Sequence, residues 1–477
     1  MKARTIADVA TAVDGRVTGD AARTVSGVAV DSRSVRPGDL FVALSGDSVD
    51  GHAFVGRALD AGAGGALVSR DWASSAGATA PGGSEALIAV ADTRQALLDL
   101  AADERDRSGA VVIGVTGSTG KTCTKDFAAA ILGRRFRTVA SAASFNNEVG
   151  LPLTILSAAE DTEVMVCEMG SRGPGHIKLL CDVARPDIGI VTNVGVAHME
   201  LFESPDVLRD AKAELPEALP PDGTAVLNAD DPVVRGYAAR TPARVLLYGT
   251  SEGAVVRAER IALSHETGWA SFDLVLPDGR GRVDLSVPGE HLVADALAAA
   301  AAVWSLGVPA AEIAAALGDA RVSSGRMDVF EGAGGFRVID DSYNANPASM
   351  AAALRAARWM AGDGRCIAVM GRMAELGPIE AEEHERIGEL AARLRIDLLV
   401  VVGAGASRIA SGAEREGIEP ERIVVCEDSD EAASVIESTA GPGDLVLVKA
   451  SRAAGLDRVV ERLRGDRLDA DGPGAAP

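Results

Sequence analysis

The sequence predicts an α/β protein of three domains, in which helices pack against largely parallel sheets. At about 150 residues per domain, a length of 477 residues corresponds to about three domains. From Gly109 onward, strand-length apolar runs alternate with helix-compatible segments, as expected for parallel strands joined by crossover helices. Aromatic residues make up 3% of the chain and 53 residues are glycine, which favours close packing of helices on strands over a large β-sandwich.

The first block, residues 1–108, is predicted to be a small α/β domain. Strand-like apolar runs occur at Val25–Val30 and Leu40–Leu44, and the turn-forming Pro37-Gly38-Asp39 separates them. The block closes with a helical pattern at Thr93–Arg107, whose leucines fall on one face and therefore predict a buried side.

The second block, residues 109–322, is predicted to contain a parallel sheet that begins with the buried strand Ala110–Val115. A β-rich insertion follows at about Ala254–Val287, and an alanine-rich helix at His291–Leu306 ends the pattern. The remaining predicted strands are Val164–Cys167, Ile188–Thr192, Ala225–Leu227 and Val245–Leu247.

The third block, residues 323–464, repeats the alternation and predicts a second α/β sheet similar to that of dinucleotide-binding folds. The tail, residues 465–477, is predicted to be disordered. The predicted strands are Arg337–Ile339, Cys366–Met370, Leu398–Val402, Ile423–Val425 and Leu445–Val448. The predicted helices begin near Ala348, Ala381, Ala406, Asp430 and Ala453.

The overall charge and the absence of long apolar runs exclude several classes of protein. The formal charge is −22, from 47 basic and 69 acidic side chains, which argues against a broadly basic surface that grips nucleic acid or anionic lipid. No run approaches the ~18 apolar residues of a membrane span, and Met1–Asp8 has no hydrophobic signal core. The five cysteines are odd in number and scattered. We therefore expect a monomeric cytoplasmic protein with reduced thiols and no membrane insertion.

A glycine-containing loop, Thr116–Thr122, follows the strand Ala110–Val115 and precedes a helix-compatible segment. Strand, glycine loop and helix are the elements of a phosphate cradle, in which Lys121 would reach the terminal phosphates and Thr122 would face Mg²⁺. Val115 stands where the strict P-loop pattern has glycine, so a plain glycine-rich turn is the alternative. The residues predicted to bind nucleotide here are Gly114, Thr116, Gly117, Ser118, Thr119, Gly120, Lys121 and Thr122.

Two further side chains are predicted to lie beside this loop. Glu168 comes directly after the strand Val164–Cys167, and His198 follows the strand Ile188–Thr192. Taken alone, Glu168 is more typical of a solvated loop carboxylate, and His198 is more typical of a helix-capping or core histidine. Because the carboxyl ends of parallel strands meet at one edge of a sheet, both are predicted to reach a metal ion next to the phosphates.

Several motifs spread along the chain resemble those of the Mur ligase family. The Tyr-Asn-Ala-Asn-Pro motif within Asp340–Pro347 is the most specific of them. In the first block, Asp31-Ser32-Arg33 followed by Pro37–Leu44 is similar to that family's UDP-sugar-binding domain. The resemblance covers nearly the whole chain apart from the tail. The other matching segments are Asn146–Thr154, Val369–Gly377 and Lys449–Arg452.

This resemblance implies an ATP-dependent amide ligase of peptidoglycan precursor synthesis, with UDP-N-acetylmuramoyl-tripeptide and D-alanyl-D-alanine as substrates. The tripeptide carboxylate would attack the γ-phosphate of ATP to give an acyl phosphate, and the dipeptide amine would then displace phosphate. Because two anions must meet, Lys121 and Mg²⁺ are expected to neutralise their charge.

The resemblance also implies individual roles. Thr122 and Glu168 correspond to ligands of a first Mg²⁺, and His198 to a ligand of a second. Lys212 matches the lysine that the family carbamylates, although alone it is typical of a solvated helix lysine. The implied catalytic residues are Lys121, His198, Lys212 and Arg326. The implied nucleotide contacts outside the loop are His291, Asp341, Asn344 and Asn346, and the implied substrate contacts are Asp31, Ser32, Arg33, Asn146 and Asn147.

The chain departs from the family pattern at a few positions. Leu292 and Asp295 stand where asparagines are usual, and an ionised Asp295 has no hydrogen-bond donor to offer adenine. Ala213 replaces the usual glycine, and Arg372 replaces an acidic residue and is given no role.

Two alternative functions remain. One is a related Mur-type or folylpolyglutamate-synthase-like ligase with another substrate, against which the Asp31-Ser32-Arg33 segment argues. The other is a non-catalytic, nucleotide-gated scaffold, which would have no need for candidate ligands of a second metal ion.

Overall fold

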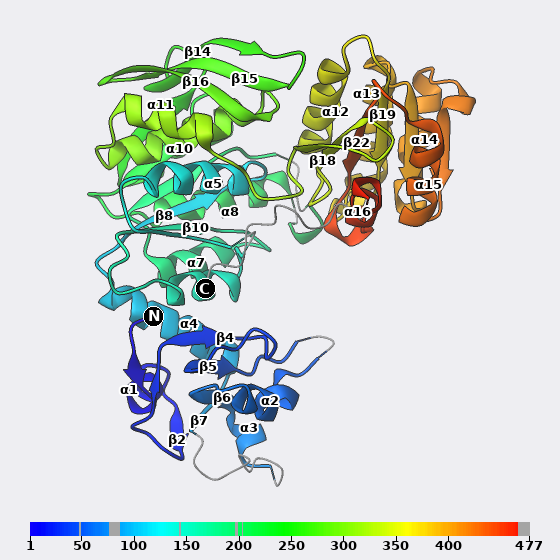
Figure 1. Ribbon diagram of the computed structural model, residues 1–477. Coiled ribbons are helices and arrows are strands. Elements are labelled where there is room, and N and C mark those ends of the chain that lie inside the picture. The colour runs from blue at the N-terminus through cyan, green and yellow to red at the C-terminus, as the bar shows by residue number, and fades with distance from the viewer. Residues whose placement is uncertain (47–48, 76–85, 143–144, 196–198, 203, 466–477) are drawn as a thin grey trace.

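The computed structural model confirms the predicted α/β class, with separate sheets in the three blocks of the chain (Figure 1). The N-terminal sheet lies at one end, and the C-terminal sheet lies beside the central one. None of the helices in the described part of the chain combines the length and the apolar character needed to cross a membrane. The structure describes residues 1–46, 49–75, 86–142, 145–195, 199–202 and 204–465.

The N-terminal sheet has the strand order β2-β7-β6-β5-β4, in which only β2 runs antiparallel. The predicted run Val25–Val30 is divided between two strands, because β3 pairs with β1 in a separate ribbon and β4 joins the sheet. The strands are β1 (Arg4–Thr5), β2 (Arg16–Thr18), β3 (Thr24–Val25), β4 (Gly27–Ala29), β5 (Asp39–Val42), β6 (Gly65–Ser69) and β7 (Leu87–Val90). The helices are α1 (Ile6–Ala12), α2 (Val55–Asp60) and α3 (Arg70–Ala73).

Helix α4 (Thr93–Arg107) has the predicted bounds and joins the first two blocks. It is capped by Asp92, whose side chain accepts hydrogen bonds from two backbone N–H groups of the first turn. Its leucine face contributes to one apolar core that also contains Leu151 and Ile155 of the central block. At its other end Arg105 donates to the carbonyl oxygen of Ala184 at 2.8 Å. The packing is therefore continuous across residue 108.

The central sheet is larger than the sequence predicts. Its order is β16-β15-β14-β13-β12-β11-β8-β10-β9. The pairings of β15 with β14 and with β16 are antiparallel, and the other pairings are parallel. The β-rich insertion is thus an extension of the same sheet. The strands are β8 (Val111–Thr116), β9 (Thr138–Ala140), β10 (Val164–Glu168), β11 (Ile188–Val191), β12 (Thr224–Asn228), β13 (Arg244–Gly249), β14 (Val256–Leu263), β15 (Trp269–Leu276) and β16 (Gly279–Pro288).

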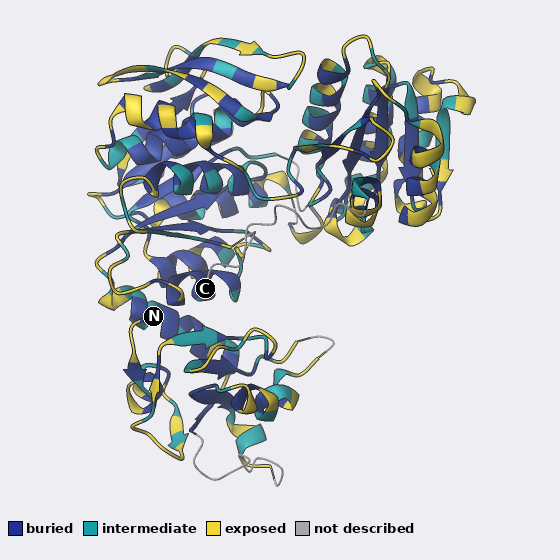
Figure 2. Ribbon diagram, viewed as in Figure 1, coloured by how far each residue is buried: buried dark blue, intermediate teal, exposed yellow. Residues whose placement is uncertain are grey.

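Helices cover both faces of the central sheet. On one face, α5 (Lys121–Leu132) packs against α10 (Leu292–Ser305), whose alanines from Ala298 to Ala302 are fully buried (Figure 2). Such small side chains let two helices and the sheet approach closely. The remaining helices are α6 (Gly150–Leu156), α7 (His176–Ala184), α8 (Pro205–Glu217), α9 (Pro232–Gly236) and α11 (Ala310–Asp319).

The C-terminal sheet has the order β17-β18-β22-β19-β20-β21, parallel except for β17. Strands β19 and β20 have the predicted bounds. Helix α16 begins later than predicted, because Arg452–Ala454 form a short 3₁₀ turn that ends at Gly455 with a φ of 66°. The strands are β17 (Asp328–Glu331), β18 (Arg337–Asp340), β19 (Cys366–Met370), β20 (Leu398–Val402), β21 (Ile423–Cys426) and β22 (Leu445–Lys449). The helices are α12 (Pro347–Ala361), α13 (Glu380–Arg393), α14 (Ser407–Glu416), α15 (Ser429–Thr439) and α16 (Asp457–Arg464).

Two contacts join the C-terminal block to the central one outside the cavity described below. Asp126 of α5 accepts hydrogen bonds from the backbone N–H and the hydroxyl of Ser323, both at 2.8 Å. His265, between β14 and β15, stacks on Trp359 of α12 with ring centroids 4.0 Å apart. The first contact holds the segment that leads into the C-terminal domain, and the second holds α12 of that domain against the central sheet.

Candidate active site

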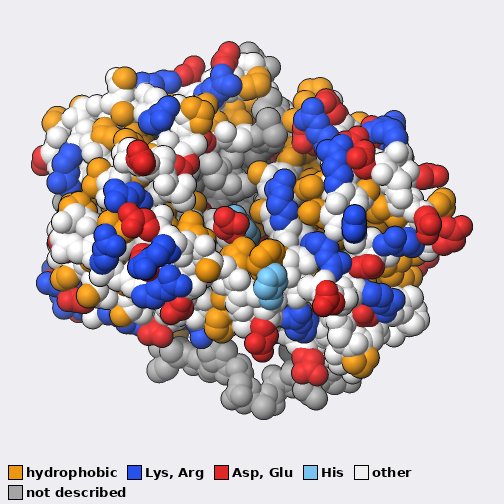
Figure 3. Space-filling view, turned by 90° about the horizontal axis from the view of Figure 1, so that it is seen from above, with side chains coloured by type: hydrophobic (Ala, Val, Ile, Leu, Met, Phe, Trp, Pro, Cys, Tyr) orange, Lys and Arg blue, Asp and Glu red, His pale blue; other side chains and the backbone are white. Residues whose placement is uncertain are grey.

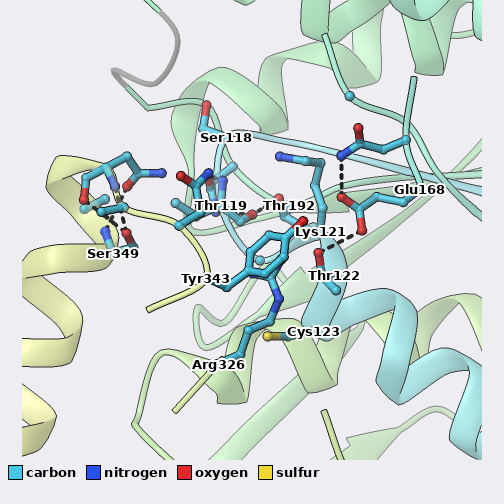
Figure 4. Close-up of a pocket in the computed structure, with 18 of the residues that line it drawn as sticks. Ser118, Thr119, Lys121, Thr122, Cys123, Glu168, Thr192, Arg326, Tyr343 and Ser349 are labelled. Carbon is cyan, nitrogen blue, oxygen red and sulfur yellow. Dashed lines mark hydrogen bonds between the residues drawn. The ribbon is translucent and has the colours of Figure 1, made fainter. Parts of the chain in front are cut away.

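A cavity of about 910 Å³ lies where the central and C-terminal domains face each other. One wall consists of the loop before α5, the end of β10 and the start of α10, and the other consists of Gly325–Met327, Asp341–Ser349 and the segment after β22. Figure 4 shows Lys121 and Thr122 from the first wall close to Arg326 and Tyr343 from the second. The face shown in Figure 3 carries basic and acidic side chains interspersed.

Two glycines in the loop before α5 have backbone angles that favour glycine. Gly117 has a φ of 145° and Gly120 a φ of 80°. A Cβ atom on Gly117 would lie 1.9 Å from the Thr192 hydroxyl oxygen, and one on Gly120 would lie 2.1 Å from a carboxylate oxygen of Asp295. The loop therefore lies so close to Thr192 and Asp295 that any side chain at these two positions would collide with them.

The loop is anchored by the segment after β11. The backbone N–H of Ser118 donates to the carbonyl oxygen of Asn193, and that of Thr119 donates to its side-chain oxygen, both at 3.0 Å. The Lys121 ammonium donates to the carbonyl oxygen of Gly117 at 2.8 Å, and burial lowers its pKa. A half-buried cation at a helix N-terminus fits a polyphosphate, because both the ammonium and the helix N-terminus attract negative charge.

Two residues assigned to nucleotide binding lie outside this cavity. Gly114 is inside β8, in register with Cys167 of β10 and Gly189 of β11, and a Cβ there would lie 3.1 Å from Leu215. The structure therefore corrects the assignment of Gly114, whose glycine serves the packing of helix α8 on the sheet. Thr116 ends β8 fully buried, and its hydroxyl donates to the carbonyl oxygen of Met169 at 2.9 Å.

We expect Gly120→Ala to weaken ATP binding at least about tenfold, because the new methyl group collides with Asp295 and the left-handed backbone is strained. The double variant Gly120→Ala, Asp295→Ala should recover part of the loss, since only the backbone strain remains. Titration of ATP by calorimetry checks both. Equal ATP affinity in wild type and Gly120→Ala would contradict the steric argument.

The candidate metal ligands are brought together beside the loop. Glu168 is 1% exposed at the end of β10, and one of its carboxylate oxygens accepts a hydrogen bond from the Thr122 hydroxyl at 2.8 Å (Figure 4). Its other oxygen accepts from the Asn146 side-chain amide at 2.8 Å. A hydroxyl and a carboxylate side by side are oxygen donors suited to Mg²⁺. His198 lies outside the described residues, and within the described ones no three His, Cys, Asp or Glu side chains group as a metal site.

Lys212 is buried, contrary to the solvated helix lysine that its position alone would suggest. It is 1% exposed on α8 and does not line the cavity. Burial, together with the positive charge of Lys121, lowers the pKa of Lys212 well below its usual range. No ion pair to a carboxylate is formed by Lys212 within the described residues. Burial of this kind disfavours the charged ammonium form of a lysine.

On the C-terminal wall, two arginines lie against one tyrosine ring. The guanidinium carbon of Arg326 lies 4.4 Å from the ring centroid of Tyr343, and that of Arg452 lies 5.3 Å away. Lys449 is 2% exposed and donates to a carboxylate oxygen of Asp341 at 2.5 Å and to the carbonyl oxygen of Asn344 at 2.9 Å. The motif around Tyr343 thus forms a cationic wall together with Arg326, Lys449 and Arg452.

The other assigned residues are divided between the cavity and the distant N-terminal domain. His291 and Asn346 line the cavity, and the side-chain oxygen of Asn346 also caps α12 by accepting from the N–H of Ser349 at 2.9 Å. Asn147 lines it too, and its side-chain oxygen accepts hydrogen bonds from the backbone N–H groups of Val149 and Gly150 just before and at the start of α6. In contrast, Asp31, Ser32 and Arg33 do not line this cavity, and Asp31 and Arg33 form an ion pair of 2.6 Å at the surface.

Sequence reasoning missed the role of Asp295 and gave none to Tyr343 or Lys449. Asp295 faces the phosphate loop at Gly120, and burial raises its pKa well above the usual range. Its place four residues after His291, the N-cap residue of α10, was a usable signal, since residues four apart at a helix start lie on the same side. Lys449 is the last residue of β22, whose other residues are all apolar. A single charged residue at the carboxyl end of a parallel strand is typical of a ligand-binding site.

Three family models match the chain. Residues 24–105 match the Mur ligase family catalytic domain, residues 115–303 the Mur ligase middle domain and residues 325–452 the Mur ligase glutamate ligase domain. The UDP-N-acetylmuramoyl-tripeptide–D-alanyl-D-alanine ligase of Mycobacterium tuberculosis is 41% identical over 97% of this chain and 98% of its own. The crystal structure of MurF from Acinetobacter baumannii is 29% identical, with a TM-score of 0.85 over 97% of this chain and 99% of its own.

A third similar protein is the MurF ligase of Thermotoga maritima in complex with ADP, which is 29% identical, with a TM-score of 0.78 over 92% of this chain and 97% of its own. The glycine loop, Lys121 and the arginines opposite suit transfer of a phosphoryl group from a nucleotide, and with these relatives they define an ATP-dependent amide ligase. The chain belongs to the Mur ligase family.

Proposed function

We propose that this enzyme joins D-alanyl-D-alanine to UDP-N-acetylmuramoyl-tripeptide with consumption of ATP, in the synthesis of peptidoglycan precursors. The observation that carries the proposal is the single cavity in which the phosphate loop faces the cationic wall of the C-terminal domain. The relatives that align over nearly the whole chain carry this activity in their names.

The geometry supports a two-step reaction. A carboxylate oxygen of the tripeptide attacks the γ-phosphorus of ATP, the bond to the bridging oxygen breaks, and ADP leaves. The dipeptide amine then attacks the acyl phosphate, loses a proton and displaces inorganic phosphate. Lys121 and Arg326, from opposite walls, are placed to balance the charge that gathers when the two anions meet. Closure of the two walls would keep water away from the acyl phosphate.

Thr122 and Glu168 fit a magnesium ion, because a buried carboxylate and a hydroxyl already lie 2.8 Å apart at the edge of the phosphate loop. When bound there, Mg²⁺ would screen the phosphate charges and polarise the phosphoryl group. Asn146 holds the second carboxylate oxygen, so it would fix the orientation of Glu168 toward the ion. His198 is proposed as a ligand of a second ion.

Lys212 is proposed to be carbamylated. Its neutral amine would attack CO₂, forming an N–C bond and releasing a proton, so that the cation becomes an anionic oxygen donor for the second metal ion. Burial without a carboxylate partner in the described part of the chain supports this, because such a site disfavours the ammonium form.

The N-terminal domain is proposed to hold the UDP-sugar end of the tripeptide substrate. The Asp31–Arg33 pair is exposed and therefore available to a ligand. Helix α4 packs on both domains, so it can set the distance between this end and the cavity. His291, Asp341, Asn344 and Asn346 are proposed nucleotide contacts.

The activity is tested by measuring phosphate release with ATP, Mg²⁺, UDP-N-acetylmuramoyl-tripeptide and D-alanyl-D-alanine together. Release should require all four components, and the product should carry both added alanines by mass. If release does not exceed that of mixtures lacking one substrate, the proposed function is wrong. Activity with a folate and glutamate instead would favour the folylpolyglutamate-type alternative, and ATP binding without turnover on any substrate would favour the scaffold.

A further inference from the structure

The cavity contains more cationic side chains than the phosphates of one nucleotide require. Lysine and arginine side chains line it at five positions, and two of these already have a carboxylate partner in the protein. Arg172 pairs with Glu148 at 3.3 Å, and Lys449 pairs with Asp341 at 2.5 Å. The other three, Lys121, Arg326 and Arg452, form no ion pair with a described residue and are available to anionic ligands.

Lys121 and Arg326 lie on the phosphate side of the cavity. Both are close enough to Asp295, which lies against the loop at Gly120, for their positive charges to oppose the rise that burial causes in the pKa of that carboxyl group. Arg326 also has a buried Nε atom without a hydrogen-bond partner in the described structure, which points to a missing anionic ligand. These two side chains therefore account for the nucleotide and for the acyl group that it activates.

Arg452 occupies a different position. It is exposed on the 3₁₀ turn Arg452–Ala454 after β22, and its guanidinium lies over the Tyr343 ring at 5.3 Å. The turn is held to the segment after β19, because the hydroxyl of Ser451 donates to the carbonyl oxygen of Arg372 at 2.7 Å. Arg452 therefore stacks on an aromatic ring and has no carboxylate partner among the described residues. A guanidinium in this position can bind a planar anion such as a carboxylate.

The walls of the cavity decide which carboxylate this is. ATP covers the phosphate loop, and the UDP-linked tripeptide must enter from the side of the N-terminal domain. The incoming amine must then approach the acyl phosphate from the remaining, C-terminal wall, where Arg452 lies.

We propose that Arg452 binds the terminal carboxylate of the incoming dipeptide and so directs its amine toward the reaction centre beside Arg326. This inference rests on the proposed function, since it concerns the acceptor of the same reaction. It makes Arg452 a residue that selects for acceptors with a free carboxylate.

The test compares D-alanyl-D-alanine with D-alanyl-D-alanine amide as acceptors. In the wild type the amide should show a KM about 10- to 100-fold higher, because one charge-assisted contact is lost. Arg452→Ala should raise the KM for the free dipeptide by a similar factor and make the two acceptors nearly equal. Arg452→Lys should retain part of the preference. The KM values for ATP and for the tripeptide should stay within about twofold.

Arg458→Ala is the matched control, because Arg458 is an exposed arginine of α16, close in sequence, that does not line the cavity. It should behave as the wild type. If Arg452→Ala still prefers the free dipeptide by the wild-type factor, or if its KM for ATP rises instead, the inference is overturned. A wild type inactive with D-alanyl-D-alanine would overturn the proposed function itself, so the two failures are distinguishable.

Discussion

Replacing Lys121 with alanine is expected to lower the rate of phosphate release by about 10³-fold or more. The Lys121 ammonium is the cation at the start of α5, and it lies in a cavity from which water can be excluded. In such a site a fixed positive charge stabilises the transferring phosphoryl group far more than it would in water. Initial rates with all substrates saturating, together with the KM for ATP, measure the effect.

Lys178→Ala is the matched control for this variant. Lys178 also lies in the first turn of a helix, α7, but it is exposed and pairs with Asp182 at 3.0 Å. Its loss should change the rate by less than about twofold, since exposed ion pairs contribute little. Full activity of Lys121→Ala in a folded protein would remove the assignment of Thr116–Thr122 as the phosphate loop.

Replacing Lys212 with alanine is expected to lower activity by about 100-fold, and the activity of the wild type should depend on bicarbonate. Because burial lowers the pKa of Lys212, its amine is neutral above that lowered pKa and protonated below it. Carbamylation requires the neutral form, so activity should fall as the pH decreases through the lowered pKa. Adding bicarbonate to CO₂-depleted enzyme should restore the rate.

Two further measurements separate carbamylation from a simple charge effect. Lys212→Arg keeps a cation but cannot form the carbamate, so it should be as inactive as Lys212→Ala. Enzyme equilibrated with ¹³C-bicarbonate should show a carbamate carbon resonance that is absent from both variants. Activity that is insensitive to bicarbonate and survives in Lys212→Ala would refute the modification.

The elements that were predicted well are those whose signal is local. Helix α4 and strands β19 and β20 match their predicted bounds, because each is an apolar pattern enclosed by caps or turns. The short strands β1 and β2 were not predicted, since two or three residues carry no periodicity. The continuation of the central sheet into β14–β16 was not predicted either, because pairing between strands depends on contacts that the local pattern does not contain.

The candidate site shows the same division. The phosphate loop and Glu168 were identified from their position after buried strands, and the structure joins them through the Thr122 hydroxyl. Gly114 was assigned wrongly, because a glycine needed for helix packing looks the same in sequence as one needed for a loop. The burial of Lys212 was also hidden, since the segment around it on α8 contains charged residues as well as apolar ones.

The sequence by itself determined the α/β class, the glycine loop between a strand and a helix, and the resemblance to Mur ligases. All three can be read from short segments of the chain, because neighbouring residues determine the local backbone conformation there. Only the tertiary structure decided which charges meet: Asp295 against Gly120, and Arg326 and Arg452 on one ring of Tyr343. The reason is physical, because Coulomb interactions and burial depend on distance in space, and residues far apart in the chain acquire that distance only when the sheets and helices pack.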